Sequence, residues 1–350
     1  MLVAAAAVAA SVLVAQAARN TLDIYFIDVE GGQATLVVTP AGESMLIDAG
    51  FPSDDGVIAP AFGMKPGASA NARDPRRIAA AAKDAGLTAL DYLMLTHYHA
   101  DHAGGAVELA GLLPIKAFID HGEPAPGADV GVPGTQKIYE QYTTLRAKGR
   151  HLQPKPGDLL PLKGLEARVV SADRQVLAAA LASAGEKNAA CSGTPLEAQE
   201  KVENPHSVGV RLQYGKFRFL DLGDLSGEPL YSLTCPNNLV GQSEVYLVAH
   251  HGGADGSDPA SFAGIKPLVA VFNNGQRKGA QPPALAAVKA AGVDGWQLHR
   301  SANPGAENAP DDRLANLDET TSAWIKVSAS EDGSFTVTNG RTGYTKRYVR

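Results

Sequence analysis

Apolar runs of strand length alternate with amphipathic segments of helical length along most of the chain. Residues 22–49 are predicted to form three strands, because Gly31-Gly32 and a Pro-Ala-Gly turn at 40–42 interrupt the apolar pattern twice. Asp74-Pro75 is typical of a helix start and Gly86 of a helix end, so a helix is predicted between them. The same reasoning predicts strands at 90–96, 115–119, 151–153, 165–171, 208–214, 217–222, 245–249, 267–272 and 295–299, and helices at 103–113, 135–148 and 282–291.

Three segments lack this periodicity. Residues 51–72 are rich in Gly, Pro, Ala and Ser and are expected to form a long surface loop, placed where it could overhang the site described below. Residues 172–203 are alanine-rich at first and lose all alternation, which indicates a partly helical insertion at the rim of the fold. Residues 301–319 are expected to form a polar loop.

The C-terminal residues, about 320–350, alternate in the manner of a small antiparallel sheet. Residues 323–329 and 334–338 flank Glu331-Asp332-Gly333, which predicts a hairpin, and 344–349 are expected to add a third strand. This sheet is either an appendage or an edge of the main sheets.

Composition and charge limit the class of protein. The chain has 350 residues, of which 45% are hydrophobic and 19% charged, enough for one large globular domain or two small ones. A net charge of −6 provides no global basic field for nucleic acid, and no run of Lys and Arg is interleaved with aromatic residues.

The first 17 residues are apolar and end in Ala15-Gln16-Ala17, which fits a cleaved signal peptide and predicts a periplasmic or secreted protein. The run is too short for a membrane span, and no transmembrane segment is expected beyond this leader. Cys191 and Cys235 could form one disulfide or stay buried as thiols.

The stretch LMLTHYHADHAGG, residues 93–105, carries the strongest chemical signal. An apolar strand ends at Thr96, and His97, His99, Asp101 and His102 follow within six residues. Beyond a strand end, residues i and i+2 point the same way, so His97 and His99 can converge on one ion. Asp101 and His102 lie on the turn into the next helix, close enough to bind a second ion. Imidazole and carboxylate are the ligands of Zn²⁺, and such sites also take Mn²⁺ or Fe.

The HxHxDH pattern at His97–His102 resembles that of the metallo-β-lactamase superfamily of αββα hydrolases. The resemblance implies a four-layer αββα sandwich within residues 20–350. Other stretches are similar to the branch that includes the DNA-uptake competence hydrolases: YFIDVEGGQATLV near the start, an NxxS pattern at Asn204 and Ser207, and HHG at 250–252. The first of these departs from the branch at Glu30 and Gln33, where Gly and Asp are typical.

The resemblance also implies the rest of a dinuclear site. Asp224, after a strand, would bridge both ions, and His206 would be the third histidine of the first ion, unless Asn204 fills that position. One residue of the pair His250 and His251 would bind the second ion.

Two further residues have roles that the sequence leaves open. Asp48 either orients a metal ligand from behind, as the resemblance implies, or is only a turn residue before glycine. His121, at a strand end, is a candidate substrate contact, although nothing near it in the sequence completes a site.

These residues predict a dinuclear metal-dependent hydrolase, most simply with two Zn²⁺ ions. Two close cations activate water, and Asp101 would orient that water and accept a proton. The competence-like features imply a small-molecule or polymeric phosphoester or phosphodiester substrate. Lactone or β-lactam hydrolysis within the same superfamily is the alternative, and a non-catalytic protein stabilised by metal is another.

Overall fold

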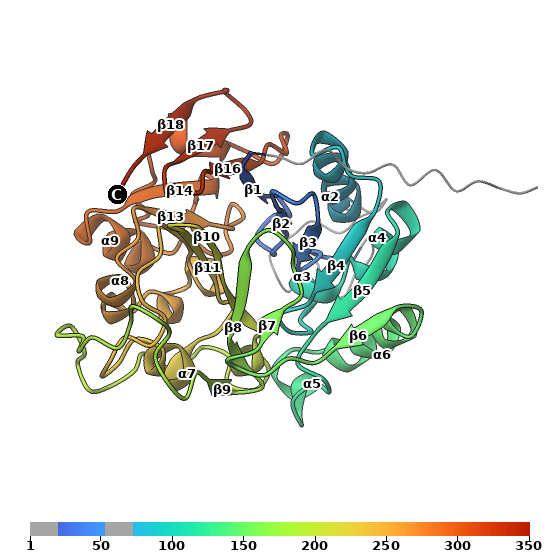
Figure 1. The fold of residues 1–350 in the computed structure, drawn as a ribbon, viewed down its shortest axis with the longest axis horizontal. Helices are drawn as coiled ribbons and strands as arrows, with labels where there is room; N and C mark the ends of the chain where they lie inside the picture. The colour runs from blue at the N-terminus through green and yellow to red at the C-terminus, as the bar shows by residue number, and fades with distance from the viewer. Residues whose placement is uncertain (1–19, 53–72) are drawn as a thin grey trace, which may run out of the picture.

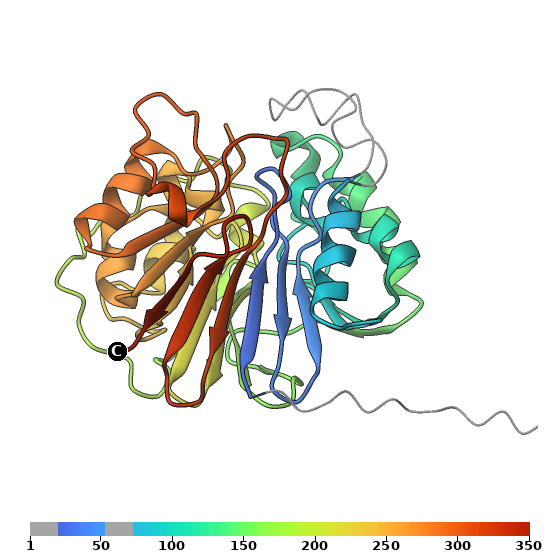
Figure 2. The ribbon, with the colours of Figure 1, turned by 90° about the horizontal axis from the view of Figure 1, so that it is seen from above.

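The computed structural model describes residues 20–52 and 73–350, and in this part of the chain two nine-stranded sheets pack face to face (Figures 1 and 2). Helices cover the outer face of each sheet, so the layers are helices, sheet, sheet and helices. The predicted αββα sandwich is confirmed. The predicted leader at 1–17 and most of the predicted loop at 51–72 lie outside the described residues.

The first sheet contains the N-terminal strands and the strand that leads to the HxHxDH motif. Its order is β18 (Thr345–Tyr348), β17 (Phe335–Asn339), β16 (Ile325–Ala329), β1 (Leu22–Phe26), β2 (Thr35–Val38), β3 (Ser44–Ile47), β4 (Leu90–Met94), β5 (Ile115–Ile119) and β6 (Arg150–Leu152). Strand β16 pairs antiparallel with β1, so the three C-terminal strands form an edge of this sheet.

The second sheet contains the later strands of the chain. Its order is β15 (Leu314–Asn316), β14 (Asp294–His299), β13 (Val269–Phe272), β12 (Val245–Leu247), β11 (Phe217–Asp221), β10 (Gly209–Tyr214), β8 (Glu166–Ala172) and β7 (Leu159–Leu160), and β9 (Gln175–Val176) pairs with β8. Strand β15 lies within the segment predicted to be a polar loop. Neighbouring strands from β3 to β6 and from β11 to β15 are parallel, which brings their carboxyl ends to common edges.

Apolar side chains fill all three interfaces between the layers. The central core lies between the sheets and includes Phe26 and Phe219, whose ring centroids are 5.7 Å apart. The helices on the first sheet are α2 (Arg73–Asp84), α3 (Ala100–Ala103), α4 (Ala106–Leu112), α5 (Ala128–Gly131) and α6 (Thr135–Arg146); those on the second are α7 (Gly227–Ser232), α8 (Pro259–Ile265) and α9 (Pro282–Ala290). Short 3₁₀ turns are η1 (Asn204–His206), η2 (His250–Gly252), η3 (Ala254–Gly256) and η4 (Asp311–Arg313).

The helix predicted at 103–113 is divided into α3 and α4 by Gly104 and Gly105. A side chain at Gly105 would place its Cβ 2.2 Å from the carbonyl oxygen of Ala49, so only glycine permits this approach. The close contact holds the metal-motif turn against the end of β3.

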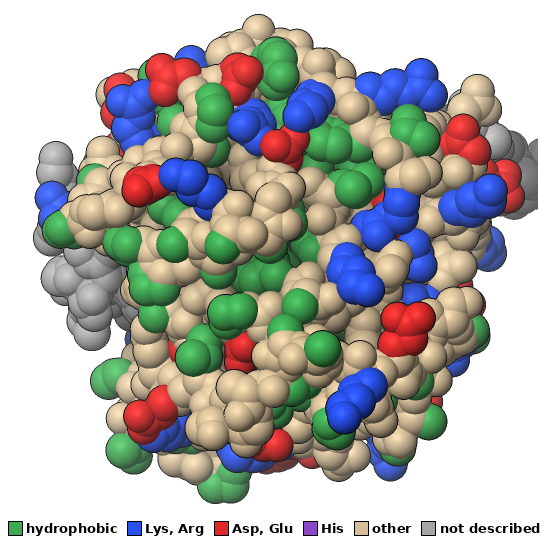
Figure 3. Space-filling model, turned by 90° about the vertical axis from the view of Figure 1, so that its left-hand side faces the viewer, with side chains coloured by type: hydrophobic (Ala, Val, Ile, Leu, Met, Phe, Trp, Pro, Cys, Tyr) green, Lys and Arg blue, Asp and Glu red, His purple; other side chains and the backbone are tan. Residues whose placement is uncertain are grey.

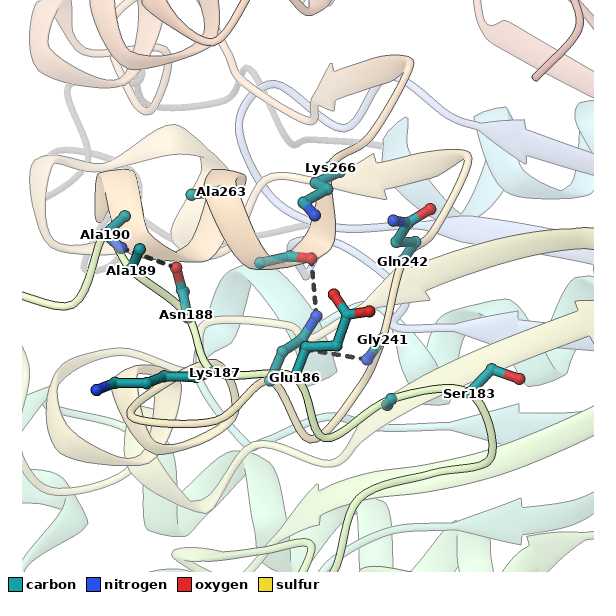
Figure 4. A pocket seen from close by; sticks show the side chains of 13 residues that line it. Ser183, Glu186, Lys187, Asn188, Ala189, Ala190, Gly241, Gln242, Ala263 and Lys266 are labelled. Carbon is teal, nitrogen blue, oxygen red and sulfur yellow. Dashed lines mark hydrogen bonds between the residues drawn. The ribbon is translucent and has the colours of Figure 1, made fainter.

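The prediction of a partly helical insertion at 172–203 is wrong. Apart from β9, this segment runs as turns and irregular chain, and it contains no helix. Its alanine run is short and largely exposed, so no apolar face is available to stabilise a helix. Tertiary bonds fix the chain instead: Cys191 and Cys235 form a disulfide, and Nδ2 of Asn188 donates to Thr234 O (3.0 Å) and Ala260 O (2.8 Å). Part of the segment borders a pocket of about 330 Å³ next to α8 (Figure 4).

Charged side chains of both signs are interspersed on the face of the molecule shown in Figure 3. Among the described residues, no helix has the length and hydrophobicity needed to cross a bilayer.

Candidate metal centre

Four side chains with metal-binding atoms meet where parallel strands of both sheets end. Asp101 and His102 lie on α3 after β4, Asp224 follows β11, and His251 lies in η2 after β12. Nε2 of His102 is 3.2 Å from Oδ2 of Asp101 and 3.2 Å from Oδ2 of Asp224. Nε2 of His251 is 3.2 Å from Oδ2 of Asp101 and 3.2 Å from Oδ1 of Asp224. All four residues are buried, and two imidazoles with two carboxylates suit a divalent cation.

Asp224 also faces a second set of imidazoles. Its Oδ2 lies 4.0 Å from Nε2 of His97 and 3.7 Å from Nε2 of His250. His99 adjoins them, with its Nδ1 3.0 Å from Nε2 of His97. Nε2 of His99 and Oδ1 of Asp224 are buried without a hydrogen-bond partner in the described structure, as expected for atoms that bind a ligand. These residues fit two adjacent cations with Asp224 between them.

The two carboxylates are ionised. Burial alone would raise the pKa of Asp224, but His102, His251 and His250 outweigh it and hold that pKa well below its usual range. Burial would likewise raise the pKa of Asp101, and the Lys278 ammonium and His102 hold it well below normal. This negative charge is what a divalent cation requires of its site.

The imidazoles respond to burial and to the charges around them. Burial, together with electrostatic repulsion from His102 and His99, holds the pKa of His97 well below its usual value. The ring of His97 is therefore neutral and available as a ligand. For His102, burial would lower the pKa, but Asp224 and Asp101 raise it well above normal. The field that attracts a proton to His102 would equally attract a metal ion.

Asp48 lies behind His102, where the resemblance put a ligand-orienting carboxylate. Its Oδ2 is 2.7 Å from Nδ1 of His102, and the carboxylate also accepts bonds from the backbone N–H and the hydroxyl of Thr96, each 2.7 Å. A hydrogen on Nδ1 leaves the lone pair of His102 on Nε2, which faces the cluster.

The turn after β12 sends two consecutive histidines into the centre. His250 and His251 have φ angles of +52° and +56°, a conformation that residues other than glycine rarely adopt. Asp255 fixes the first of them, with Oδ1 2.7 Å from Nδ1 of His250, so Nε2 of His250 faces Asp224. The sequence left open which histidine binds metal, and the geometry brings both of them to Asp224.

Lys278, on the loop after β13, pairs with Asp101 and was not predicted to belong to the site. With Arg277, His250, His251 and other residues it lines a pocket of about 250 Å³ beside the centre. The sequence could have indicated Lys278 through the position of its loop. The loop follows β13, a parallel strand of the same sheet, and the end of β13 must lie near the ends of β11 and β12.

The remaining predicted residues lie to one side of the centre. Nδ2 of Asn204 is 3.4 Å from Nε2 of His250, so Asn204 borders the His97 set. His206 instead has its Nδ1 2.7 Å from Oδ1 of Asp173, and its ring centroid lies 5.5 Å from that of His121. Nε2 of His121 is bonded to Glu203, 3.1 Å away. The structure therefore brings His121 and His206 together beside Asp173, because η1 and the turn at Asp173 hold His206 there.

Residues 27–169 match the family model of the metallo-beta-lactamase superfamily. The chain has the metallo-beta-lactamase fold. The match includes the HxHxDH motif, and it confirms the resemblance to the superfamily. The likeness to the competence branch stays a prediction. No protein with a curated description matches the chain in sequence.

Several solved structures are similar to the chain at low sequence identity. A metallo hydrolase from Ignicoccus hospitalis is 16% identical over 81% of this chain and 96% of its own, with a TM-score of 0.42. A metallo-beta-lactamase fold protein from Bacillus subtilis is 13% identical over 80% of this chain and 95% of its own, also with a TM-score of 0.42. A HARLDQ-motif mutant of a metallo-beta-lactamase from Cronobacter sakazakii is 13% identical over 57% of this chain, with a TM-score of 0.32, and this chain spans only 60% of its length.

Proposed function

We propose that this chain is a dinuclear metal-dependent hydrolase that cleaves a phosphoester or phosphodiester. One observation carries the proposal: Asp224 lies within 4.0 Å of an imidazole nitrogen of each of four histidines, His97, His102, His250 and His251. A binding site for a single structural ion needs only four ligands. The larger set of buried ligand atoms supports a two-ion centre.

The chain's own residues would supply positioning and proton transfer. Two bound divalent cations would lower the pKa of water and polarise the bond to be cleaved. Asp101 is buried beside His102 and His251, and its carboxylate would orient a water molecule and accept its proton. Asp48 and Asp255 hold His102 and His250 in the orientation in which Nε2 faces the centre. No serine or cysteine nucleophile is required.

The charge of the adjacent pocket supports an anionic substrate. Arg277 and Lys278 line the pocket together with His250 and His251, so two cationic side chains lie next to the metal ligands. A phosphate oxygen is a natural partner for such groups. The competence-like HHG and NxxS patterns favour the same substrate class.

Zinc is the proposed metal because the ligands are mainly imidazole, and Mn²⁺ or Fe would also accept this set. The disulfide between Cys191 and Cys235 supports an oxidising compartment, in line with the predicted periplasmic or secreted location.

The test is metal-dependent turnover of bis-p-nitrophenyl phosphate, measured beside a lactone and a β-lactam. Chelation should abolish hydrolysis and Zn²⁺ should restore it. Asp224→Ala should lose activity while its circular dichroism spectrum is retained, and Asp318→Ala, at a fully exposed position, should behave as wild type. Selective turnover of the lactone or lactam would favour the alternative substrates. Bound metal without turnover of any of the three would favour a non-catalytic protein.

A further inference from the structure

His121, Asp173 and His206 form a second cluster of metal-binding side chains. Each contributes one ligand atom, and the three atoms lie within 4.8 Å of one another. The residues come from three separate segments: the end of β5, the turn between β8 and β9, and η1. Only the fold brings them together, so no sequence motif marks the cluster.

A hydrogen bond to Glu203 fixes the ring of His121 within this cluster. Its Nε2 lies 3.1 Å from Oε1 of Glu203, whose other oxygen accepts a bond from the backbone N–H of Ala125 at 2.8 Å. A carboxylate oxygen of Glu203 accepts in this contact, and an imidazole N–H of His121 donates. The hydrogen of His121 therefore lies on Nε2, and its lone pair lies on Nδ1. That Nδ1 is buried without a hydrogen-bond partner in the described structure, and His121 as a whole is only 2% exposed.

Asp173 reaches the cluster from a strained turn. Asp173 and Arg174 have φ angles of +48° and +61° and connect the paired residues Ala172 and Gln175 in a two-residue hairpin. Such turns favour Asn-Gly or Asp-Gly, so arginine at the second position is strained. The N–H of Asp173 also donates to the carbonyl of His206 at 3.1 Å, which fixes the turn to η1.

The cluster is open to solvent on one side. The side chain of Asp173 is 55% exposed and that of His206 10% exposed, whereas that of His121 is fully buried. The exposed carboxylate of Asp173 would therefore give an ion a route from solvent to the cluster.

We propose that His121, Asp173 and His206 bind one divalent transition-metal ion of the zinc class, separate from the centre around Asp224. Two imidazoles and one carboxylate are a common zinc ligand set, and it leaves a coordination position for water or a ligand. Glu203 is the outer carboxylate that orients His121. The proposal stands whether or not the chain is a hydrolase, because it concerns different residues.

The experiment measures zinc bound per chain, by equilibrium dialysis and elemental analysis of the full-length protein, in wild type and in His121→Gln, Asp173→Asn and His206→Gln. Each substitution should remove the same single ion, and the double variant His121→Gln/His206→Gln should remove no more than one. His151→Gln, at a partly exposed histidine outside the cluster, is the matched control and should keep the wild-type content. Thermal unfolding followed by circular dichroism identifies any variant that fails to fold. Glu203→Gln should weaken binding of the ion at this cluster roughly 10–100-fold, because it removes the carboxylate that orients His121.

Two results would overturn the proposal. The first is an unchanged zinc content in all three folded variants. The second is loss of an ion from His206→Gln alone, which would assign His206 to the centre around Asp224, as the family resemblance implies. A hydrolase test that failed while one ion still depended on His121 would leave this site standing.

Discussion

Oδ2 of Asp48 lies 2.7 Å from Nδ1 of His102, although the two residues are 54 positions apart in the chain. This bond fixes which nitrogen of His102 faces Asp101 and Asp224. It links the end of β3 to the turn after β4, so the orientation of a ligand depends on the pairing of two parallel strands.

Asp48→Asn should weaken metal binding roughly 10–100-fold, because an amide cannot hold the His102 tautomer as a carboxylate does. The measurement is zinc affinity by competition with a chromogenic chelator. Asp91→Asn is a suitable control, since Asp91 makes similar bonds to Ser44 on the neighbouring strand but lies away from the centre. Equal affinities of Asp48→Asn and wild type would contradict the assigned role of Asp48.

Lys278→Gln should raise KM for bis-p-nitrophenyl phosphate about tenfold, which corresponds to about 1.4 kcal/mol of lost interaction with an anionic substrate. Steady-state kinetics with zinc in excess separates this effect from metal loss. Lys289→Gln removes an exposed lysine that pairs with Glu307 and should leave KM unchanged. An unchanged KM in Lys278→Gln would count against a phosphate-binding role for the pocket.

Asp294 of β14 bonds to Lys346 and Tyr348 of β18, the C-terminal strand. Because these bonds favour the ionised form of Asp294, we expect the stability of the fold to depend on pH. Burial would raise the pKa of Asp294, but hydrogen bonds from Lys346 and Tyr348 outweigh it and lower that pKa. Because the pKa of Asp294 is lower in the folded state than in the unfolded chain, its carboxylate stabilises the fold at pH values above the ordinary pKa of aspartate. This stabilisation is lost as the pH falls through the pKa of Asp294 in the folded state. Asp294→Asn should therefore cost about 1 kcal/mol of unfolding free energy at pH 7 and less near pH 3.5, measured by urea denaturation. A cost that stays constant with pH would show that the charge of Asp294 is not responsible.

The disulfide should stabilise the irregular segment that follows β9. Cys191 and Cys235 are 44 residues apart, and closing a loop of that length stabilises a fold by at most about 4 kcal/mol. Urea denaturation with and without a reductant should show this difference in wild type and no difference in Cys191→Ser. If the reductant shifts neither midpoint, the disulfide contributes no stability.

The features best predicted from the sequence are those that depend on residues close together in the chain. The HxHxDH motif follows one strand directly, so the positions of His97, His99, Asp101 and His102 follow from a single turn. The helix predicted at 172–203 failed because alanine content alone does not stabilise a helix without a face to bury. The neighbours of His206 could not be predicted, because Asp173 and His121 reach it from other segments of the fold. Lys278 was missed for the same reason.

The most direct test of the account is anomalous X-ray diffraction at the zinc edge from crystals of the zinc-loaded protein. A dinuclear centre should give two peaks about 3.5–4 Å apart beside the Asp224 carboxylate, one near His97 and one near His102. A single peak there, or none, would contradict the proposed dinuclear centre.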